Sequence, residues 1–124
     1  KGTNYGWKRV AWGGKNYSGT KVGQGNAWEP GLLKPDHIWV PSIGVGGIKF
    51  YQGDAFPEWN NFLLVGSLKF QYLSVLPRIE DGFGKEKIIF KNKIGRIRDI
   101  EINEDGAIFL IADEYETSLF KLTP

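Results

Sequence analysis

Apolar and polar positions along the chain follow a strand-like rhythm and almost no helical one. No window of about 11 residues places apolar side chains at i, i+3, i+4 and i+7 without an interrupting Gly or Pro. From Ile38 onward, short β-branched or aromatic runs begin about every ten residues, the spacing of antiparallel hairpins. These runs predict strands at residues 38–40, 48–52, 62–66, 70–77, 86–90, 97–103, 107–113 and 119–122.

Residues 1–37 differ from the rest, because Gly, Asn, Lys and aromatic residues dominate them. Such frequent breaks exclude long strands and predict an ordered surface loop, pinned by Trp7, Trp12 and Trp28. Exposed Trp and Tyr can instead stack on sugar faces, and a carbohydrate platform is the alternative for these side chains.

Turn residues divide the predicted strands into two groups. Asp105-Gly106, between two apolar runs, supplies the positive φ that a tight hairpin needs, and Asp81-Gly82 predicts a second turn. Residues 46–90 then hold four strands and residues 96–123 hold three. Four-stranded units repeated around an axis are blades of a β-propeller, and a three-stranded last blade takes its fourth strand from elsewhere in the chain.

The fold class expected is therefore all-β, with antiparallel four-stranded blades of a propeller. The division expected is a loop region with a connecting strand at 1–45, one blade at 46–95, and a last, three-stranded blade at 96–124. Two blades cannot close a ring. Because the chain also starts with Lys rather than Met, we expect it to be the C-terminal piece of a longer protein.

Composition narrows the function classes. The chain has 124 residues with no Cys, which excludes disulfides, thiolate zinc sites and cysteine nucleophiles. No apolar run approaches the roughly 18 residues of a membrane-spanning helix, so no membrane partner is expected. A net charge of +2 does not favour nucleic acid. The local run of six Lys and Arg between Lys85 and Arg98 faces only Glu86 and is typical of a solvated strand edge.

Residues able to act as catalysts are few. His37 is the sole histidine and lies in a polar turn, so an exposed loop histidine is favoured over a general base. The glycines at 44–47 precede a strand rather than a helix, which argues against a dinucleotide fingerprint. Asn16-Tyr17-Ser18 matches a glycosylation sequon, a motif that is common by chance.

Arg96 and Arg98 form the most informative pair. On a strand, positions i and i+2 share a face, so both guanidinium groups point the same way and can grip a polycarboxylate or a phosphate. The alternative is an exposed strand end whose arginines pair with Asp99 or Glu101. Lys69, at a strand junction, is either a point charge for a ligand or a solvated turn lysine.

Six ordered motifs together resemble the C-terminal third of the glucose/sorbosone dehydrogenases, the soluble quinoproteins that include aldose sugar dehydrogenase. They lie at residues 4–7 (Asn-Tyr-Gly-Trp), 39–43, 50–59, 62–69, 96–99 with 105–106, and 110–113. The resemblance covers essentially the whole chain, and six motifs in order are far more specific than any one of them.

The resemblance implies a six-bladed β-propeller, of which this chain is about the two C-terminal blades. It further implies pyrroloquinoline quinone (PQQ) and calcium at one end of the propeller axis, and oxidation of the C1 hydroxyl of aldoses to lactones. PQQ is a tricarboxylate and requires cationic contacts, and the matching positions are Lys69, Arg96 and Arg98. The resemblance also places Ser42 and Asp113 beside the cofactor and Tyr5 beside a calcium site. A periplasmic or secreted location is implied as well.

Departures from the family pattern limit what carries over. Lys8 stands where the family usually has Pro, and the loop at 41–47 lacks part of the family's Pro-Ser-Ile-Ala-Pro-Ser-Gly run. The family's catalytic histidine lies upstream in a motif that His37 does not match, so this piece alone is expected to be inactive. The alternative function is a non-catalytic propeller that serves as a binding scaffold. Open strand edges and apolar patches also predict that the isolated piece self-associates.

Overall fold

The computed structural model describes residues 2–16 and 18–124, and the chain divides into two compact units, Lys1–Ser42 and Ile43–Pro124. Described by itself, the first unit is a set of turns, and the isolated bridge between Lys15 and Lys21 is the only ladder contact among its described residues. Its backbone is held by bonds such as Ala11 N–H to Asn26 O at 3.1 Å and Leu33 N–H to Asn4 O at 3.0 Å. The predicted loop is confirmed for the part of this unit that the structure describes.

Two expectations for the first unit are wrong. Residues 38–40 form no strand, because Pro35 and Pro41 flank them and neither can donate a ladder hydrogen bond. Trp7 does not anchor the loop, since 87% of its surface is exposed at the tip of a turn that Arg9 N–H closes on Gly6 O. The apolar side chain that is buried within the described part of this unit is Leu32, which is 8% exposed.

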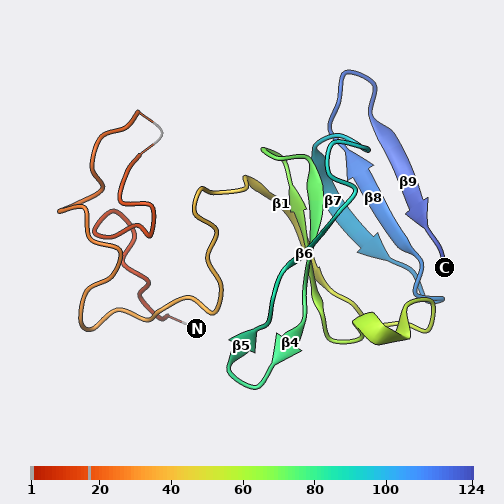
Figure 1. The fold of residues 1–124 in the computed structure, drawn as a ribbon, viewed down its shortest axis with the longest axis horizontal. Coiled ribbons are helices and arrows are strands. Elements are labelled where there is room, and N and C mark those ends of the chain that lie inside the picture. Colours follow the sequence, from red (N-terminus) through yellow and green to blue (C-terminus); the bar gives the residue numbers. More distant parts are fainter. Residues whose placement is uncertain (1, 17) are drawn as a thin grey trace. The chain divides into compact units, whose positions relative to one another are not determined.

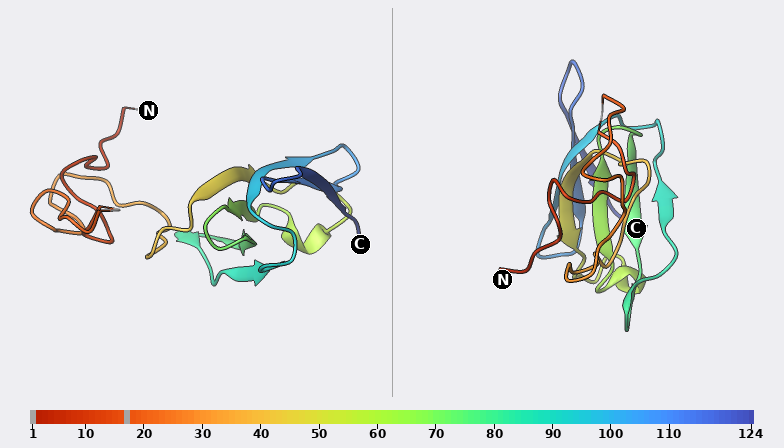
Figure 2. Two further views of the ribbon diagram at one scale, coloured as in Figure 1. Left: turned by 90° about the horizontal axis from the view of Figure 1, so that it is seen from above. Right: turned by 90° about the vertical axis from the view of Figure 1, so that its left-hand side faces the viewer.

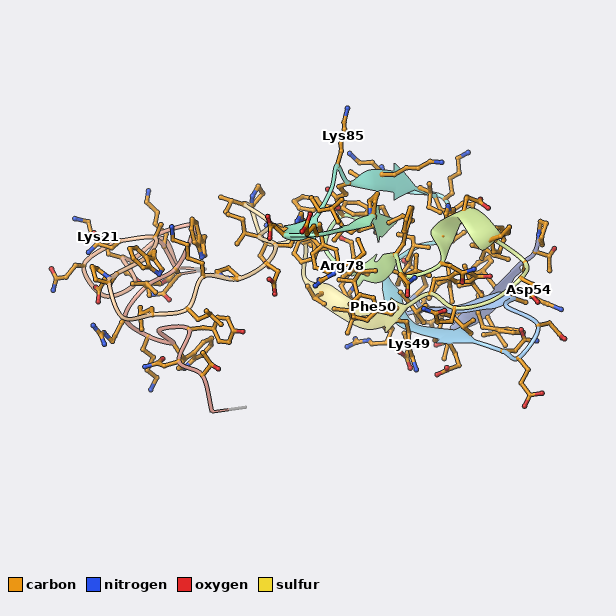
Figure 3. The ribbon with its side chains drawn as sticks, turned by 90° about the horizontal axis from the view of Figure 1, so that it is seen from below. Lys21, Lys49, Phe50, Asp54, Arg78 and Lys85 are labelled. Carbon is orange, nitrogen blue, oxygen red and sulfur yellow. The ribbon has the colours of Figure 1, made fainter. Side chains whose placement is uncertain are left out.

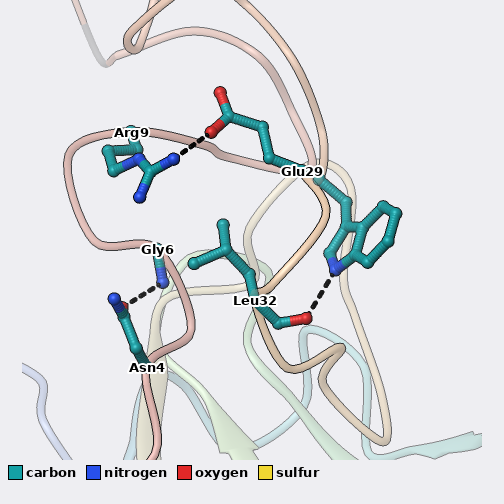
Figure 4. A network of polar contacts seen from close by, with 6 residues as sticks. Asn4, Gly6, Arg9, Glu29 and Leu32 are labelled. Carbon is teal, nitrogen blue, oxygen red and sulfur yellow. Dashed lines mark hydrogen bonds and ion pairs between the residues drawn. The ribbon is translucent and has the colours of Figure 1, made fainter.

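Polar contacts stabilise the first unit in place of an apolar core (Figure 4). Arg9 donates to Glu29 Oε2 at 2.6 Å, and Gly6 N–H donates to Asn4 Oδ1 at 2.8 Å. Trp28 Nε1 donates to the Leu32 carbonyl at 2.9 Å, while Lys34 Nζ lies 4.7 Å from the Trp28 ring centroid. Trp28 therefore does hold the loop, through its polar end.

The second unit contains a four-stranded antiparallel sheet in the order β1-β2-β3-β6 (Figure 1). Its strands are β1 (Val45–Phe50), β2 (Leu63–Ser67), β3 (Tyr72–Leu76) and β6 (Lys87–Ile89). A short 3-10 helix, η1 (Pro57–Trp59), lies between β1 and β2. A small hairpin of β4 (Arg78–Ile79) and β5 (Gly82–Phe83) follows β3. The predicted Asp81-Gly82 turn joins its two strands.

Aromatic and cationic side chains connect that hairpin to β1. The Phe50 and Phe83 rings stack with centroids 6.3 Å apart, and Arg78 lies 5.1 Å from the Phe83 centroid. Figure 3 shows Phe50 and Arg78 near each other.

The remaining strands form a three-stranded antiparallel sheet, β7 (Ile97–Ile102), β8 (Ile108–Ala112) and β9 (Ser118–Leu122). Its first turn is the one predicted: Gly106 has φ of +81° and donates to Asn103 O at 3.0 Å, and Ala107 N–H donates to Asn103 Oδ1 at 2.8 Å. The predicted grouping into four strands and three is confirmed.

The core lies where β1 and β2 pack against β7, so the two sheets stand side by side (Figure 2). Its buried side chains are Tyr51, Leu64, Leu73, Val75, Ile97, Ile100, Ile108 and Leu110. Glycine permits the close approach: a Cβ on Gly47 would lie 2.6 Å from Ile100 N, and one on Gly66 would lie 2.7 Å from Ile97 Cγ2. The chain is thus all-β, with antiparallel sheets of the propeller-blade kind. Among the described residues, no helix has the length and apolarity needed to span a bilayer.

Candidate functional site

Three segments of the second unit meet at one end of the two sheets (Figure 1). The β2–β3 turn, residues 68–71, carries Lys69, and its strand end at Ser67 pairs with Val45 of β1. β7 begins beside this turn. Gly46 of β1 lies so close to the start of β7 that a Cβ there would be 2.2 Å from the Ile97 carbonyl oxygen. β8 ends at Ala112, opposite Ile97, and brings Asp113 to the same end. Lys69, Arg96, Arg98 and Asp113 therefore share this end of the unit.

A β-bulge shapes the arginine pair. Ile97 pairs with Ala112 and Asp99 pairs with Ile111, so Arg98 is the extra residue that has no opposite partner in the ladder. Its guanidinium donates from Nη2 to Asp113 Oδ2, and Arg96 Nη2 lies 3.7 Å from the same oxygen. Both guanidinium groups are thus directed at one oxygen, as expected, although Arg96 precedes β7 and Arg98 is the bulged residue, so the regular alternation of a strand is not the cause.

The carboxylate that meets both arginines is not one of those expected in the alternative. Asp99 Oδ1 accepts from the backbone N–H of Ile100 at 2.9 Å, and Glu101 Oε2 pairs with Lys49 of β1 at 2.9 Å. The alternative in which Arg96 and Arg98 pair with Asp99 or Glu101 is therefore wrong, because both guanidinium groups reach Asp113, just beyond the end of β8.

The ion pairs with the two arginines affect the pKa of Asp113. The hydrogen bond from Arg98, followed by its charge and that of Arg96, lowers the pKa of Asp113 against the opposing effect of burial. Asp113 is therefore a carboxylate at neutral pH, and the two arginines with it carry a net charge of +1. Lys49 likewise lowers the pKa of Glu101 through a hydrogen bond, away from this cluster.

Lys69 lies on a firmly held turn. Its backbone N–H donates to Ile43 O at 2.9 Å, and the buried Ser67 hydroxyl donates to the same carbonyl at 2.9 Å while accepting from Phe70 N–H at 3.0 Å. Its ammonium lies 5.2 Å from the Phe70 ring centroid. The turn thus presents a cation at the end of the sheets that carries the arginine pair.

Tyr5 and Ser42 belong to the first unit, and their roles beside calcium and cofactor stay predictions. Tyr5 is 55% exposed between Asn4 and Gly6, which bond to each other. Among the described residues, no group of three or more His, Cys, Asp or Glu side chains could hold a metal ion. His37 is half-buried rather than exposed, with its ring 4.4 Å from that of Trp39. The sequon includes Tyr17, which lies outside the described residues.

Two contributors to the site were not predicted. Glu114 accepts the backbone N–H of Arg96 through Oε1 at 3.0 Å, and Gly46 lets β1 approach the carbonyls of Ile97 and Arg98. Gly46 had a visible signal, since a glycine pair that opens a strand often marks close backbone approach. The contact of Glu114 depends on how the β8–β9 turn folds, which no local pattern shows.

The donor set fits a polycarboxylate. Lys69, Arg96 and Arg98 put three positive charges at one end of two packed sheets, with the carboxylates of Asp113 and Glu114 beside them. Arginine binds carboxylates in a bidentate manner and lysine binds them as a point charge. PQQ, with its three carboxylates, has the charge and the acceptor groups that such a set recognises.

The fold defines a class, the all-β proteins built from antiparallel propeller blades, and the comparisons identify the family. The family model "Glucose / Sorbosone dehydrogenase" matches residues 1–121, and the chain belongs to this family. The aldose sugar dehydrogenase YliI of Escherichia coli strain K12 is 34% identical over 125 residues, covering 100% of this chain and 33% of that protein. An uncharacterized protein of Synechocystis, slr1608, is 30% identical over 125 residues. The match covers 98% of this chain and 29% of the Synechocystis protein.

Solved structures agree with this assignment. A crystal structure of a glucose dehydrogenase superposes with a TM-score of 0.90 at 33% identity, covering 99% of this chain and 36% of the other. The apo-form of the soluble aldose sugar dehydrogenase from Escherichia coli superposes with a TM-score of 0.88 at 34% identity, covering 100% of this chain and 36% of that one. The chain thus spans about a third of the length of its relatives.

Proposed function

We propose that this chain is part of a PQQ-dependent sugar dehydrogenase that oxidises the C1 hydroxyl of aldoses to lactones. Lys69, Arg96 and Arg98 bind carboxylates of the cofactor, and Asp113 and Ser42 lie beside it. Tyr5 contributes a backbone carbonyl near calcium. The observation that carries the proposal is the gathering of three cationic side chains at one end of two blades of this dehydrogenase family.

When bound, PQQ would supply the acceptor for the hydride, which carries both electrons away from C1 of the sugar. The chain's residues hold and orient it: the arginines through planar N–H pairs, Lys69 through a single charge. The proton of the sugar hydroxyl needs a base, and His37, half-buried against Trp39 in a loop outside the family motif, does not supply it. We assign the base to a part of the longer protein that precedes these blades in a six-bladed ring.

The remaining parts of the proposal follow from the same family. An aldose and an electron acceptor are the partners of the complete enzyme, and its location is the periplasm or outside the cell. A non-catalytic scaffold of the same fold is the competing function.

Dye-linked sugar oxidation by the full-length protein, reconstituted with PQQ and calcium, tests the proposal. We expect activity that depends on added PQQ and, at limiting PQQ, falls about 10- to 100-fold in Lys69→Ala and at least about 100-fold in Arg96→Ala/Arg98→Ala, because each lost charge-assisted contact is worth roughly 1.5–3 kcal/mol. Lys121→Ala, which removes an exposed lysine of β9, is the matched control and should keep full activity. A folded protein that neither oxidises aldoses nor binds PQQ would establish the scaffold instead.

A further inference from the structure

We infer that Asp113 is a positioning residue for cofactor binding: its carboxylate holds the guanidinium groups of Arg98 and Arg96 in the orientation that receives a cofactor carboxylate. It acts through the arginines and does not itself touch the cofactor. The inference rests on the proposed function and assigns the acidic residue of the site a separate role.

The first reason is chemical. A carboxylate repels the carboxylates of PQQ, so a direct contact gives Asp113 no favourable role there. Its Oδ2 atom instead receives Nη2 of Arg98 and lies 3.7 Å from Nη2 of Arg96. A guanidinium carries five N–H groups in one plane, so a bond from one terminal nitrogen to Asp113 fixes the plane and leaves further N–H groups to bind a ligand.

The second reason is the backbone frame around the three side chains. Asp113 N–H donates to the Arg96 carbonyl at 2.7 Å, and Arg96 N–H donates to Glu114 Oε1 at 3.0 Å. On the other side, Gly46 packs so closely that a Cβ there would lie 3.0 Å from the Arg98 carbonyl oxygen. Arg98 therefore lies on β7, and Arg96 and Asp113 lie just beyond the paired ends of β7 and β8, joined by a backbone hydrogen bond. This leaves the long arginine side chains as the part that needs orienting.

The third reason is that the arginines are half exposed. Their side chains keep 47% and 55% of their surface, and Asp113 keeps 36%. Exposed arginines sample many rotamers, and ordering each of them on binding weakens affinity. A carboxylate that orders both in advance strengthens binding.

Asp113 has two opposing effects on an anionic ligand, and salt separates them. Its negative charge cancels one positive charge of the site, which weakens long-range attraction, whereas its hydrogen bond to Arg98 and its ion pair with Arg96 order the arginines. The long-range part is screened, because the Debye length falls to about 3 Å at 1 M ionic strength. The orienting part persists, since it depends on direct contact.

The test is a titration of PQQ into the calcium-loaded full-length apoprotein, followed by calorimetry, at about 0.1 M and 1 M salt. For Asp113→Asn we expect the Kd to rise about tenfold, and to rise further relative to wild type at 1 M salt. Asp113→Glu, which keeps the carboxylate, should recover most of the affinity. Glu101→Gln is the control. It changes a carboxylate on β7, the strand that carries Arg98, and breaks an ion pair with Lys49 of β1, and it should leave the Kd unchanged.

A double-mutant cycle shows whether Asp113 acts through Arg98. Arg98→Lys keeps the positive charge but has no plane to orient, so Asp113→Asn in that background should change the Kd by less than about threefold.

Three results separate the possible failures. Wild-type protein that binds no PQQ would refute the proposed function. Wild type that binds PQQ, with Asp113→Asn binding equally or more tightly at 1 M salt, would refute the positioning role alone. An equal tenfold loss in the Arg98→Lys background would also refute it, because Asp113 would then act independently of Arg98.

Discussion

At the scale of single residues, the sequence predicts that Arg96 and Arg98 act as a pair, but it does not predict which carboxylate they contact. Arg96 and Arg98 meet at one carboxylate oxygen, so they point the same way as predicted, although Arg96 precedes β7 and Arg98 lies at its bulge. The bulge at Arg98 is set by the register of β7 against β8, so it could not be seen in a local pattern. For the same reason the arginines pair with Asp113 and not with their sequence neighbours.

Tyr51 is the residue whose role was least visible in the sequence. It is fully buried, donates from its hydroxyl to Gly106 O at 2.8 Å, and accepts from Phe56 N–H at 3.0 Å. The hydroxyl thus joins the end of β1 to the β7–β8 turn, across 55 residues of sequence.

For Tyr51→Phe we expect the free energy of unfolding to fall by about 1–3 kcal/mol, because two buried backbone groups lose their partner. Urea denaturation of the full-length protein measures this. Tyr115→Phe, at a fully exposed position, should leave the midpoint unchanged. Equal midpoints for Tyr51→Phe and wild type would show that water replaces the hydroxyl.

At the scale of elements, apolar runs with turn residues at both ends were predicted well. The seven strands of the two large sheets were all expected, with ends that differ by no more than a few residues. The run at 38–40 has the same apolar composition but no neighbouring strand among the described residues of its unit, so it forms none. The small β4–β5 hairpin was predicted only as a turn, because two-residue strands carry no periodicity.

Close packing of the two sheets depends on glycine. A Cβ at Gly47 would lie 2.6 Å from Ile100 N and 2.7 Å from the Asp99 Cα, both backbone atoms of a paired strand. Gly47→Ala should therefore lower the free energy of unfolding by about 1–3 kcal/mol, as overpacking does in cores.

Gly84→Ala is the matched control in the same unit, since its nearest neighbour would be 3.5 Å away. Thermal denaturation of both full-length variants compares them. If Gly47→Ala has the same melting temperature as Gly84→Ala and wild type, the two sheets can move apart without loss of stability. The close contact at Gly47 would then not determine how the sheets pack.

At the scale of the whole molecule, strand counting anticipated what the comparisons found. A four-stranded and a three-stranded sheet cannot close a propeller, and the chain spans about a third of its relatives' length. The apolar side chains Ile48, Phe50, Ile88 and Leu119 stay exposed on the outer strands, so self-association of the isolated chain stays a prediction. The relation of Tyr5 and Ser42 to the cationic cluster could not be derived, since long loops carry no register.

The central claim, that one end of these two blades binds the cofactor, is tested most directly by a crystal structure of the full-length protein with PQQ and calcium. We expect cofactor carboxylates within about 3.2 Å of Lys69 Nζ and of the guanidinium nitrogens of Arg96 and Arg98. In the same structure the Asp113 carboxylate should remain bonded to Arg98. PQQ bound elsewhere, with Arg96 and Arg98 in contact only with Asp113 and solvent, would contradict the account.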